Sequence, residues 1–408
     1  MIVIFLVLFF IAKRLYKSKG ITPSLFVVAT FLVSTIIGIV YRIHMPMSIY
    51  TDYNYFSMIY YALNLAVLLF PLIVNMGLYS DFSFPANCIN KISALLIVGG
   101  IMALIYEIQE IDFSIIAANW SDIRNDYYST MEDTKSVSSL YGKVGVNFEH
   151  VLFFAVPLSF YHLSKREKHI SFLLLLVSFS VLFHSLRMGE RQSILLWLSY
   201  VVMSYLIFKP VLSNKVKKHI GRLLLFSSLL LGLILALITF SRFGEDGNDR
   251  LLQSLYAYSG EQPYNAAFFL EKLSQNTLGG KLNFSFLFGE QSIYIINDFF
   301  TTDFYLNSFS SIVGSYYKDF GYYTILVSIS VSSFFFYLMK RVKINNTLLF
   351  LYIYCIYFNM MFVGVFYNKY TNPTLIRNIV IFGIIIYFIE LLSKQTKSEL
   401  DKFKWQRN

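Results

Sequence analysis

The chain has 408 residues, enough for about two or three soluble domains, but its composition does not fit a soluble protein. Hydrophobic residues make up 56% of the sequence and aromatic residues 18%, whereas charged residues make up only 14%, against roughly 25% in soluble domains. The apolar residues come in blocks of about 20, the length that crosses about 30 Å of hydrocarbon. The composition therefore predicts an all-α, polytopic transmembrane helical bundle, and it excludes soluble enzymes and nucleic-acid-binding modules.

Eleven apolar blocks predict transmembrane helices when the sequence is taken in chain order. The first block is short, but its basic residues follow the apolar run instead of preceding it, so we interpret it as a helix and not as a signal peptide. The predicted helices cover residues 1–12, 21–41, 55–78, 91–108, 146–163, 170–186, 192–208, 223–241, 321–339, 345–366 and 375–392.

Basic residues predict the orientation of these helices, because cytoplasmic loops are enriched in Lys and Arg. Alternate gaps between the helices hold 21 of the 34 basic residues. We therefore place those gaps in the cytoplasm, the N-terminus in the periplasm and the C-terminus in the cytoplasm. The net charge of +10 then follows from topology and from anionic lipid at the inner leaflet, and it calls for no nucleic acid partner.

Two outward loops are longer than a connection needs, and long loops commonly carry function. The predicted segments are 1–241 with eight helices and a first periplasmic loop at about 107–145, a large periplasmic loop at 242–320, three helices in 321–393, and a cytoplasmic tail at 394–408. Apolar stretches at 264–270 and 284–288 predict short helices in the large loop, lying on or dipping into the outer membrane interface.

Arginine usage distinguishes the two faces of the membrane. The cytoplasmic side holds 5 Arg and 16 Lys, whereas the outward side holds 7 Arg and 6 Lys. A guanidinium grips a phosphate at two points, whereas an ammonium acts as a point charge. The outward arginines therefore predict a diphosphate ligand, and the best candidates are Arg187, Arg191, Arg242 and Arg250.

Each arginine also has a structural interpretation. Arg187 and Arg191 lie in a very short outward turn, where they could reach lipid headgroups or be neutralised by Glu190. Arg242 and Arg250 flank an acidic stretch that includes Glu245, Asp246 and Asp249, so an ion-paired turn is an open alternative.

Further candidates lie in the large outward loop. Tyr256, Tyr258 and Tyr264 surround residues 260–263 and could stack on a sugar, although tyrosine is also common at membrane interfaces. Asn307, Tyr316 and Asp319 precede the ninth predicted helix, and a carboxylate such as that of Asp319 is costly near the membrane unless it is paired or used.

The sequence predicts no metal site and no cofactor. None of the six histidines has a short metal-ligand spacing, and no acidic triplet suits a divalent cation. The two cysteines, Cys88 and Cys355, cannot form a disulfide framework or a thiolate site. A proton acceptor could come from Glu245, Asp246, Asp319 or His150, and the sequence does not choose among them.

Three segments together resemble the Wzy family of O-antigen repeat-unit polymerases. They are Arg187 to Trp197, the Ser241-Arg242-Phe243 segment where the chain leaves the eighth predicted helix, and the run from Asn307 to Gly321 that contains Tyr-Tyr-Lys-Asp-Phe-Gly. The resemblance implies a GT-C-like glycosyltransferase of the bacterial inner membrane.

By this resemblance the enzyme joins undecaprenyl-diphosphate-linked repeat units at the periplasmic face, without a metal. Donor and acceptor are then both lipid-linked glycans, and a chain-length regulator is a possible partner. Two alternatives stay open: the related O-antigen ligase, and a lipid-linked oligosaccharide flippase, which would be a transporter.

Overall fold

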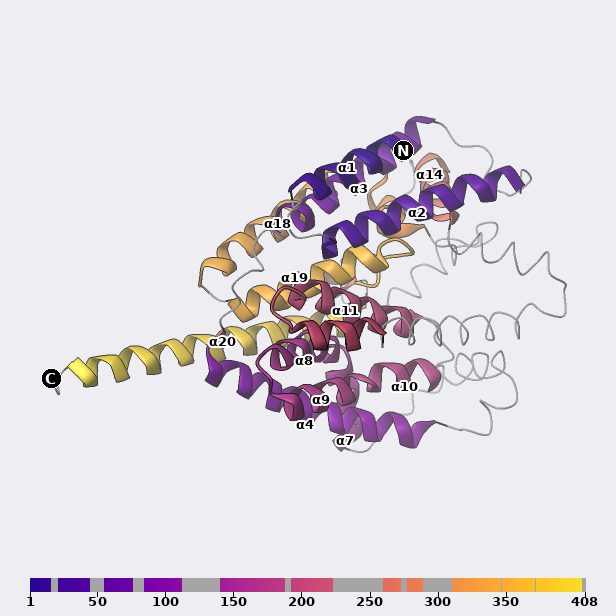
Figure 1. Cartoon of the computed structure of the whole chain (residues 1–408). Helices are drawn as coiled ribbons and strands as arrows, with labels where there is room; N and C mark the ends of the chain where they lie inside the picture. The colour runs from indigo at the N-terminus through magenta and orange to yellow at the C-terminus, as the bar shows by residue number, and fades with distance from the viewer. Residues whose placement is uncertain are drawn as a thin grey trace. The chain divides into compact units, whose positions relative to one another are not determined.

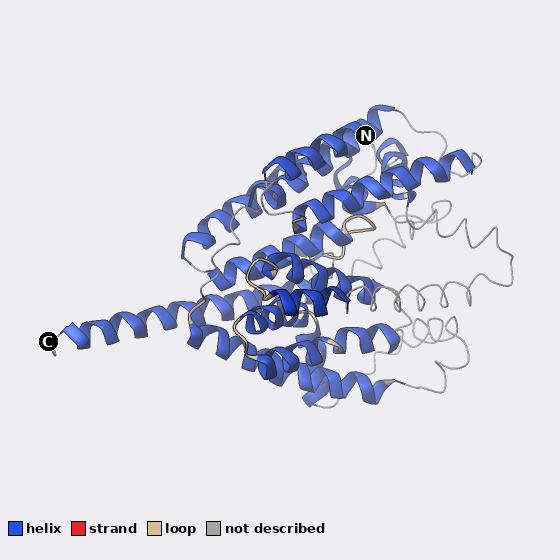
Figure 2. Ribbon diagram, in the orientation of Figure 1, coloured by secondary structure: helices blue, strands red, loops and turns tan. Residues whose placement is uncertain are grey.

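The computed structural model is helical, and it contains no strand within the residues it describes (Figure 2). The described residues are 1–15, 21–44, 55–75, 84–111, 140–187, 192–222, 260–272, 277–288, 310–345, 347–370 and 372–405. The expectation of an all-α chain is confirmed for these residues.

The helices follow one another along the chain as labelled in Figure 1. The first part comprises α1 (Ile2–Leu15), α2 (Pro23–His44), α3 (Tyr55–Val74), α4 (Ala86–Glu110), α7 (Leu140–Glu149), η3 (Leu152–Phe154), α8 (Ala155–Ser164), α9 (Lys168–Ser178), α10 (Ser180–Arg187) and α11 (Gln192–Phe208). The second comprises α14 (Gln262–Lys272), α15 (Ser285–Phe288), α17 (Ser311–Phe320), η5 (Gly321–Tyr323), α18 (Thr324–Asn345), α19 (Thr347–Val363) and α20 (Pro373–Trp405).

Helical structure occurs within every predicted transmembrane range except 223–241, which lies outside the described residues, as do residues 76–78 and 346 of two other ranges. Five of the described helices are long and apolar enough to cross a membrane, and a bent pair formed by residues 143–149 and 152–164 would make a sixth. Residues 168–184, 193–208 and 348–363 form shorter apolar helices. The chain is therefore membrane-embedded.

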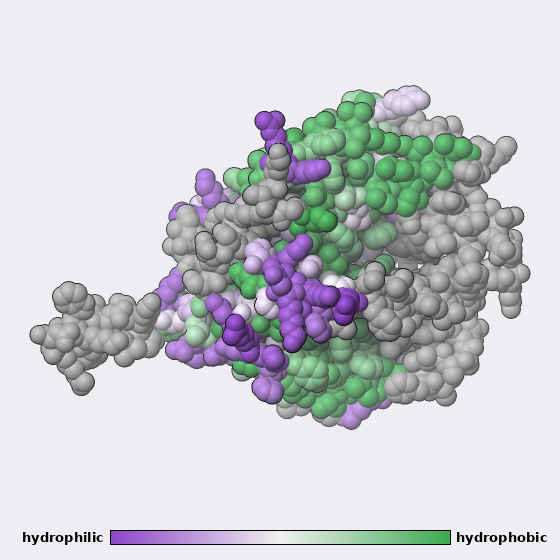
Figure 3. All heavy atoms as spheres, in the orientation of Figure 1, coloured by the Kyte–Doolittle hydropathy of each residue, from purple (hydrophilic) through white to green (hydrophobic). Residues whose placement is uncertain are grey.

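Large apolar side chains on the helix surfaces agree with a lipid environment. Phe10, Ile43, Phe172 and Phe334 are each at least 60% exposed, and Figure 3 shows apolar surface over several of the helices. Water would make such a surface prone to aggregation, whereas lipid tails solvate it. These faces are the ones that we expect to contact lipid.

The chain divides into two compact units, each assembled from separated segments. Unit 1 comprises Met1–Leu78, Asp246–Lys340 and Ile356–Ile376, and unit 2 comprises Tyr79–Glu245, Arg341–Cys355 and Arg377–Asn408. In unit 1, Gly38 of α2 and Gly260 pack backbone to backbone, since a Cβ on Gly38 would lie 2.5 Å from the Gly260 oxygen. Small residues allow such close packing in membrane proteins.

The large predicted loop contains the two expected short helices, α14 and α15. Ala266, Ala267 and Leu270 of α14 are fully buried within the protein. Helix α14 packs against α17 and α3 within unit 1, because these neighbours offer its apolar side chains a protein interior. Helix α17 is also buried, and together with α18 it forms a candidate span over residues 311–342.

Candidate functional site

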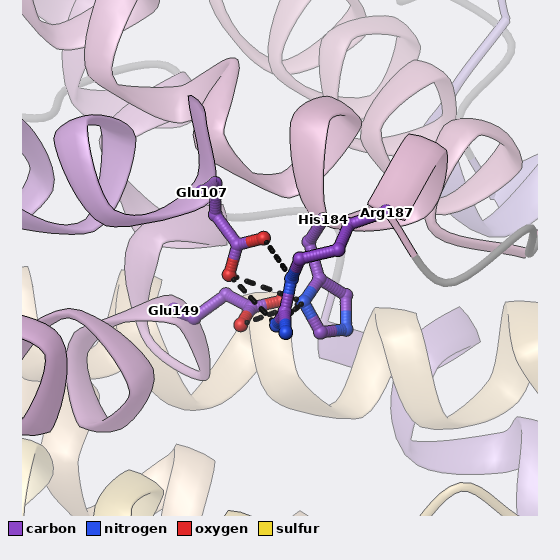
Figure 4. Close-up of polar contacts among 4 residues, drawn as sticks. All are labelled: Glu107, Glu149, His184 and Arg187. Atoms are coloured by element: carbon purple, nitrogen blue, oxygen red, sulfur yellow. Dashed lines mark hydrogen bonds and ion pairs between the residues drawn. The ribbon is translucent and has the colours of Figure 1, made fainter. Parts of the chain in front are cut away.

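Four ionisable side chains of unit 2 converge near the ends of three helices (Figure 4). Glu107 lies in the last turn of α4, Glu149 ends α7, and His184 and Arg187 lie on α10. His184 Nδ1 lies 3.3 Å from a Glu107 oxygen and 3.1 Å from a Glu149 oxygen. Because Glu107 is only 1% exposed, these are interactions of the protein interior.

Glycines explain how α7 comes close enough to α4. A Cβ on Gly99 would lie 2.2 Å from the ring of Phe148, and a Cβ on Gly145 would lie 3.0 Å from Cα of Ala103. Any larger residue would push the two helices apart. On α10, residues three positions apart share one face, which places His184 and Arg187 together.

Glu107 holds Arg187 along one edge of the guanidinium. Nε donates to Oε2 of Glu107 at 2.7 Å, and Nη2 donates to Oε1 at 3.2 Å. The guanidinium also lies over the ring of Tyr106, 5.4 Å from its centre. Burial lowers the pKa of Arg187, but the Glu107 carboxylate outweighs that effect, so the net pKa is raised and the side chain stays charged.

This arrangement leaves part of the guanidinium available. A guanidinium carries five N–H donors, and Glu107 takes the edge formed by Nε and Nη2. Among the described residues, Nη1 donates to none. Glu107 therefore pairs with Arg187, whereas Glu190, the partner that the sequence suggested, lies outside the described residues.

The environment of His184 is less well satisfied. Its Nδ1 faces both carboxylates, and it also lies 3.2 Å from Nη2 of Arg187. If Nδ1 carries a proton, it can donate to the carboxylates, but its N–H then faces the Nη2 donor. If Nδ1 carries no proton, it can accept from Nη2, but its lone pair then faces two negatively charged carboxylates. Neither state satisfies all three neighbours.

Asp319 belongs to a different polar network, in unit 1. Its carboxylate accepts from the backbone N–H of Leu282 at 3.1 Å, and from the backbone and side-chain N–H groups of Asn283 at 2.7 and 2.6 Å. The Asn283 side-chain oxygen accepts in turn from Ser315 and Asn368. Asp319 on α17 thus binds residues 282 and 283, which precede α15, by hydrogen bonds.

Two other predicted residues also lie inside unit 1. Tyr264 on α14 and Tyr316 on α17 are 7% and 3% exposed, so both rings are in the interior. The remaining predicted residues lie outside the described part of the chain: Arg191, Arg242, Arg250, Tyr256, Tyr258 and Asn307.

Sequence reasoning did not find Glu107, Glu149 or His184 as members of one site. Glu107 is 77 residues from His184 and 80 from Arg187 along the chain, so no short motif joins them. One signal was present: Glu107 is an acidic residue near the end of a long apolar run, where a carboxylate is costly without a partner.

A scan of the sequence against protein-family profiles found no match, and neither did searches of curated proteins and of solved structures. Any functional conclusion therefore depends on the residues themselves.

Proposed function

We propose that this protein is a membrane glycosyltransferase that polymerises undecaprenyl-diphosphate-linked oligosaccharide repeat units at the periplasmic face of the bacterial inner membrane. The proposed architecture has eleven spans and a GT-C-like fold. The observation that carries the proposal is the position of Arg187, which Glu107 holds from one side, while no other described residue accepts from its Nη1.

This geometry suits a diphosphate group. A guanidinium whose Nε edge is fixed cannot rotate freely, so its remaining donors are already oriented when an anion arrives. Two N–H groups can then grip two phosphate oxygens. Glu107 reduces the net charge near Arg187, so we expect further arginines to contribute, and Arg191, Arg242 and Arg250 are the candidates.

The proposed reaction breaks the bond between the anomeric carbon and the diphosphate oxygen of the donor. The electron pair of that bond goes to the diphosphate, where arginines stabilise the developing charge. A hydroxyl oxygen of the acceptor sugar forms the new bond to the anomeric carbon. Its proton goes to a base, and Glu149 joins the earlier candidates because it lies beside Arg187 and His184.

A test of the activity uses purified full-length protein and a lipid-diphosphate-linked repeat unit. We expect a ladder of products that grows by one repeat at a time. A product that forms only when lipid A core is added would favour the O-antigen ligase. Movement of the lipid-linked unit across the bilayer, with no ladder, would favour the flippase and refute the proposal.

Arginine-to-lysine substitutions test the proposed role of the arginines. Lysine keeps the charge but loses the two-point grip, so we expect at least two of the variants at Arg187, Arg191, Arg242 and Arg250 to lose ladder synthesis, with Arg187 or Arg191 among them. Protein levels should stay normal. If all four lysine variants polymerise normally, the arginines do not bind the diphosphate.

Reporter fusions test the proposed orientation. Fusions after residues 90, 168, 215 and 342 should report the cytoplasm, and fusions after residues 130 and 270 should report the periplasm. A cytoplasmic signal at residue 270 would overturn both the orientation and the periplasmic location of the reaction.

A further inference from the structure

Three side chains of unit 2 present metal-ligand atoms to one another. Glu107 and Glu149 each offer a carboxylate oxygen and His184 offers Nδ1, and these three atoms all lie within 4.8 Å of one another. Each comes from a different helix, so packing of α4, α7 and α10 fixes their positions. The set combines one nitrogen and two oxygen donors.

The spacing of these atoms suits a small divalent cation. Tetrahedral zinc with bonds of about 2.0 to 2.1 Å separates neighbouring ligand atoms by about 3.3 to 3.4 Å. The distances from Nδ1 to the two carboxylate oxygens are 3.3 and 3.1 Å. A cation could therefore enter between the three atoms with small movements of the side chains.

We propose that Glu107, Glu149 and His184 form a binding site for a divalent transition-metal ion, with zinc as the best-matched cation. Imidazole and carboxylate donors are typical ligands of zinc. Three protein ligands leave one position open for water or for an oxygen of a ligand. The site does not depend on the proposed glycosyltransferase activity.

The directions of the ligand atoms support the proposal. Both carboxylate oxygens face the same imidazole nitrogen, at 3.3 and 3.1 Å. A cation would accept the Nδ1 lone pair and attract both carboxylates.

Arg187 has a defined relation to the proposed cation. Its Nε holds Oε2 of Glu107, which leaves Oε1 as the oxygen that faces His184. Metal-binding carboxylates are commonly oriented by such a hydrogen bond to the second oxygen. Nη2, however, contacts the same Oε1 and Nδ1 atoms that the cation would bind. Arg187 therefore orients one ligand and competes with the ion.

The test measures zinc bound to full-length protein in detergent micelles. Purified protein is incubated with zinc, desalted, and analysed for metal content, with affinity measured by calorimetry. We expect one zinc per wild-type chain, and at least a tenfold weaker affinity in Glu149→Gln and in His184→Gln. His219→Gln is the matched control, because His219 is exposed and its Nδ1 contacts the backbone oxygen of Lys215.

Removal of Arg187 gives the opposite expectation. Arg187→Met deletes the competing cation, so zinc affinity should rise by a factor of several while Glu149→Gln still weakens it. A metal content equal in wild-type, Glu149→Gln and His184→Gln proteins would overturn the proposal, as would an equal loss in His219→Gln. These readouts do not involve the ladder assay, so failure of one proposal leaves the other standing.

Variants that fold poorly are identified by a second measurement. Each protein is heated in detergent with and without zinc, and the melting temperature is recorded. An ion that binds the folded state raises the melting temperature. We expect this shift in wild-type and His219→Gln proteins and a smaller shift in His184→Gln. A shift of equal size in His184→Gln would refute the site.

Discussion

Unit 1 and unit 2 each bury a polar network that contains carboxylates, but the two networks differ in what remains unsatisfied. In unit 1 the chain itself supplies three donors to Asp319, and Asn283 is saturated by Ser315 and Asn368. In unit 2, Arg187 has more N–H donors than Glu107 accepts from. His184 Nδ1 faces both a carboxylate, which favours a proton on it, and Nη2 of Arg187, which does not.

The difference separates stabilising networks from binding sites. A buried charge by itself indicates neither, because folding can satisfy it completely. Unit 1 shows such a case, since three donors of the chain surround Asp319. In unit 2, the described residues take only part of the donor capacity of Arg187, which is the property expected of a site.

The largest effect should come from Asp319→Ala. The substitution leaves buried N–H groups of Leu282 and Asn283 without an acceptor, and breaking such a network costs about 3 to 5 kcal/mol. We expect a large drop in melting temperature and in the yield of folded protein, measured in detergent. Asp319→Asn keeps one acceptor oxygen, so its melting temperature should fall less. Normal melting of Asp319→Ala would show that the network is not structural.

Gly99→Ala should disturb the unit 2 cluster without removing any of its charges. The new methyl group would overlap the ring of Phe148, next to Glu149, and overpacking of this kind costs about 1 to 3 kcal/mol. Melting temperature measures the loss. Gly383→Ala is the control, because its new Cβ would lie 3.4 Å from the ring of Tyr352, which is an ordinary contact distance. Equal behaviour of the two variants would contradict the proposed packing.

Glu107→Gln should weaken the hold on Arg187, and it also removes a carboxylate that faces His184. The amide keeps one acceptor oxygen but loses the charge, so it holds the guanidinium more weakly. We expect ladder synthesis to fall about tenfold, the equivalent of about 1.4 kcal/mol, with little change in protein level. An unchanged rate would mean that Glu107 does not position Arg187 for the reaction.

The smallest effect should come from Lys217→Gln. Lys217 is one of the basic residues assigned to the cytoplasmic side, where neighbouring lysines carry the same signal. Ladder synthesis and melting temperature should both stay at wild-type values. A marked loss would show that arginines are not the cations on which activity depends.

The sequence predicted the helices well because each corresponds to one continuous run of apolar residues. It predicted the short helices in the large loop for the same reason, but not the burial of α14, since burial depends on distant partners such as α3 and α17. Arg187 was found from its position at a helix end. Its partner Glu107 was missed, because packing of α10 against α4 brings together residues 80 positions apart that no local pattern connects.

The length of α20 has a practical consequence. Its 33 residues span about 50 Å at 1.5 Å per residue, whereas the apolar part that could cross a membrane ends at Lys394. The rest of the helix projects about 16 Å further. A fluorescent protein or an affinity tag fused after this helix would thus be carried on a built-in spacer, clear of lipid headgroups and detergent.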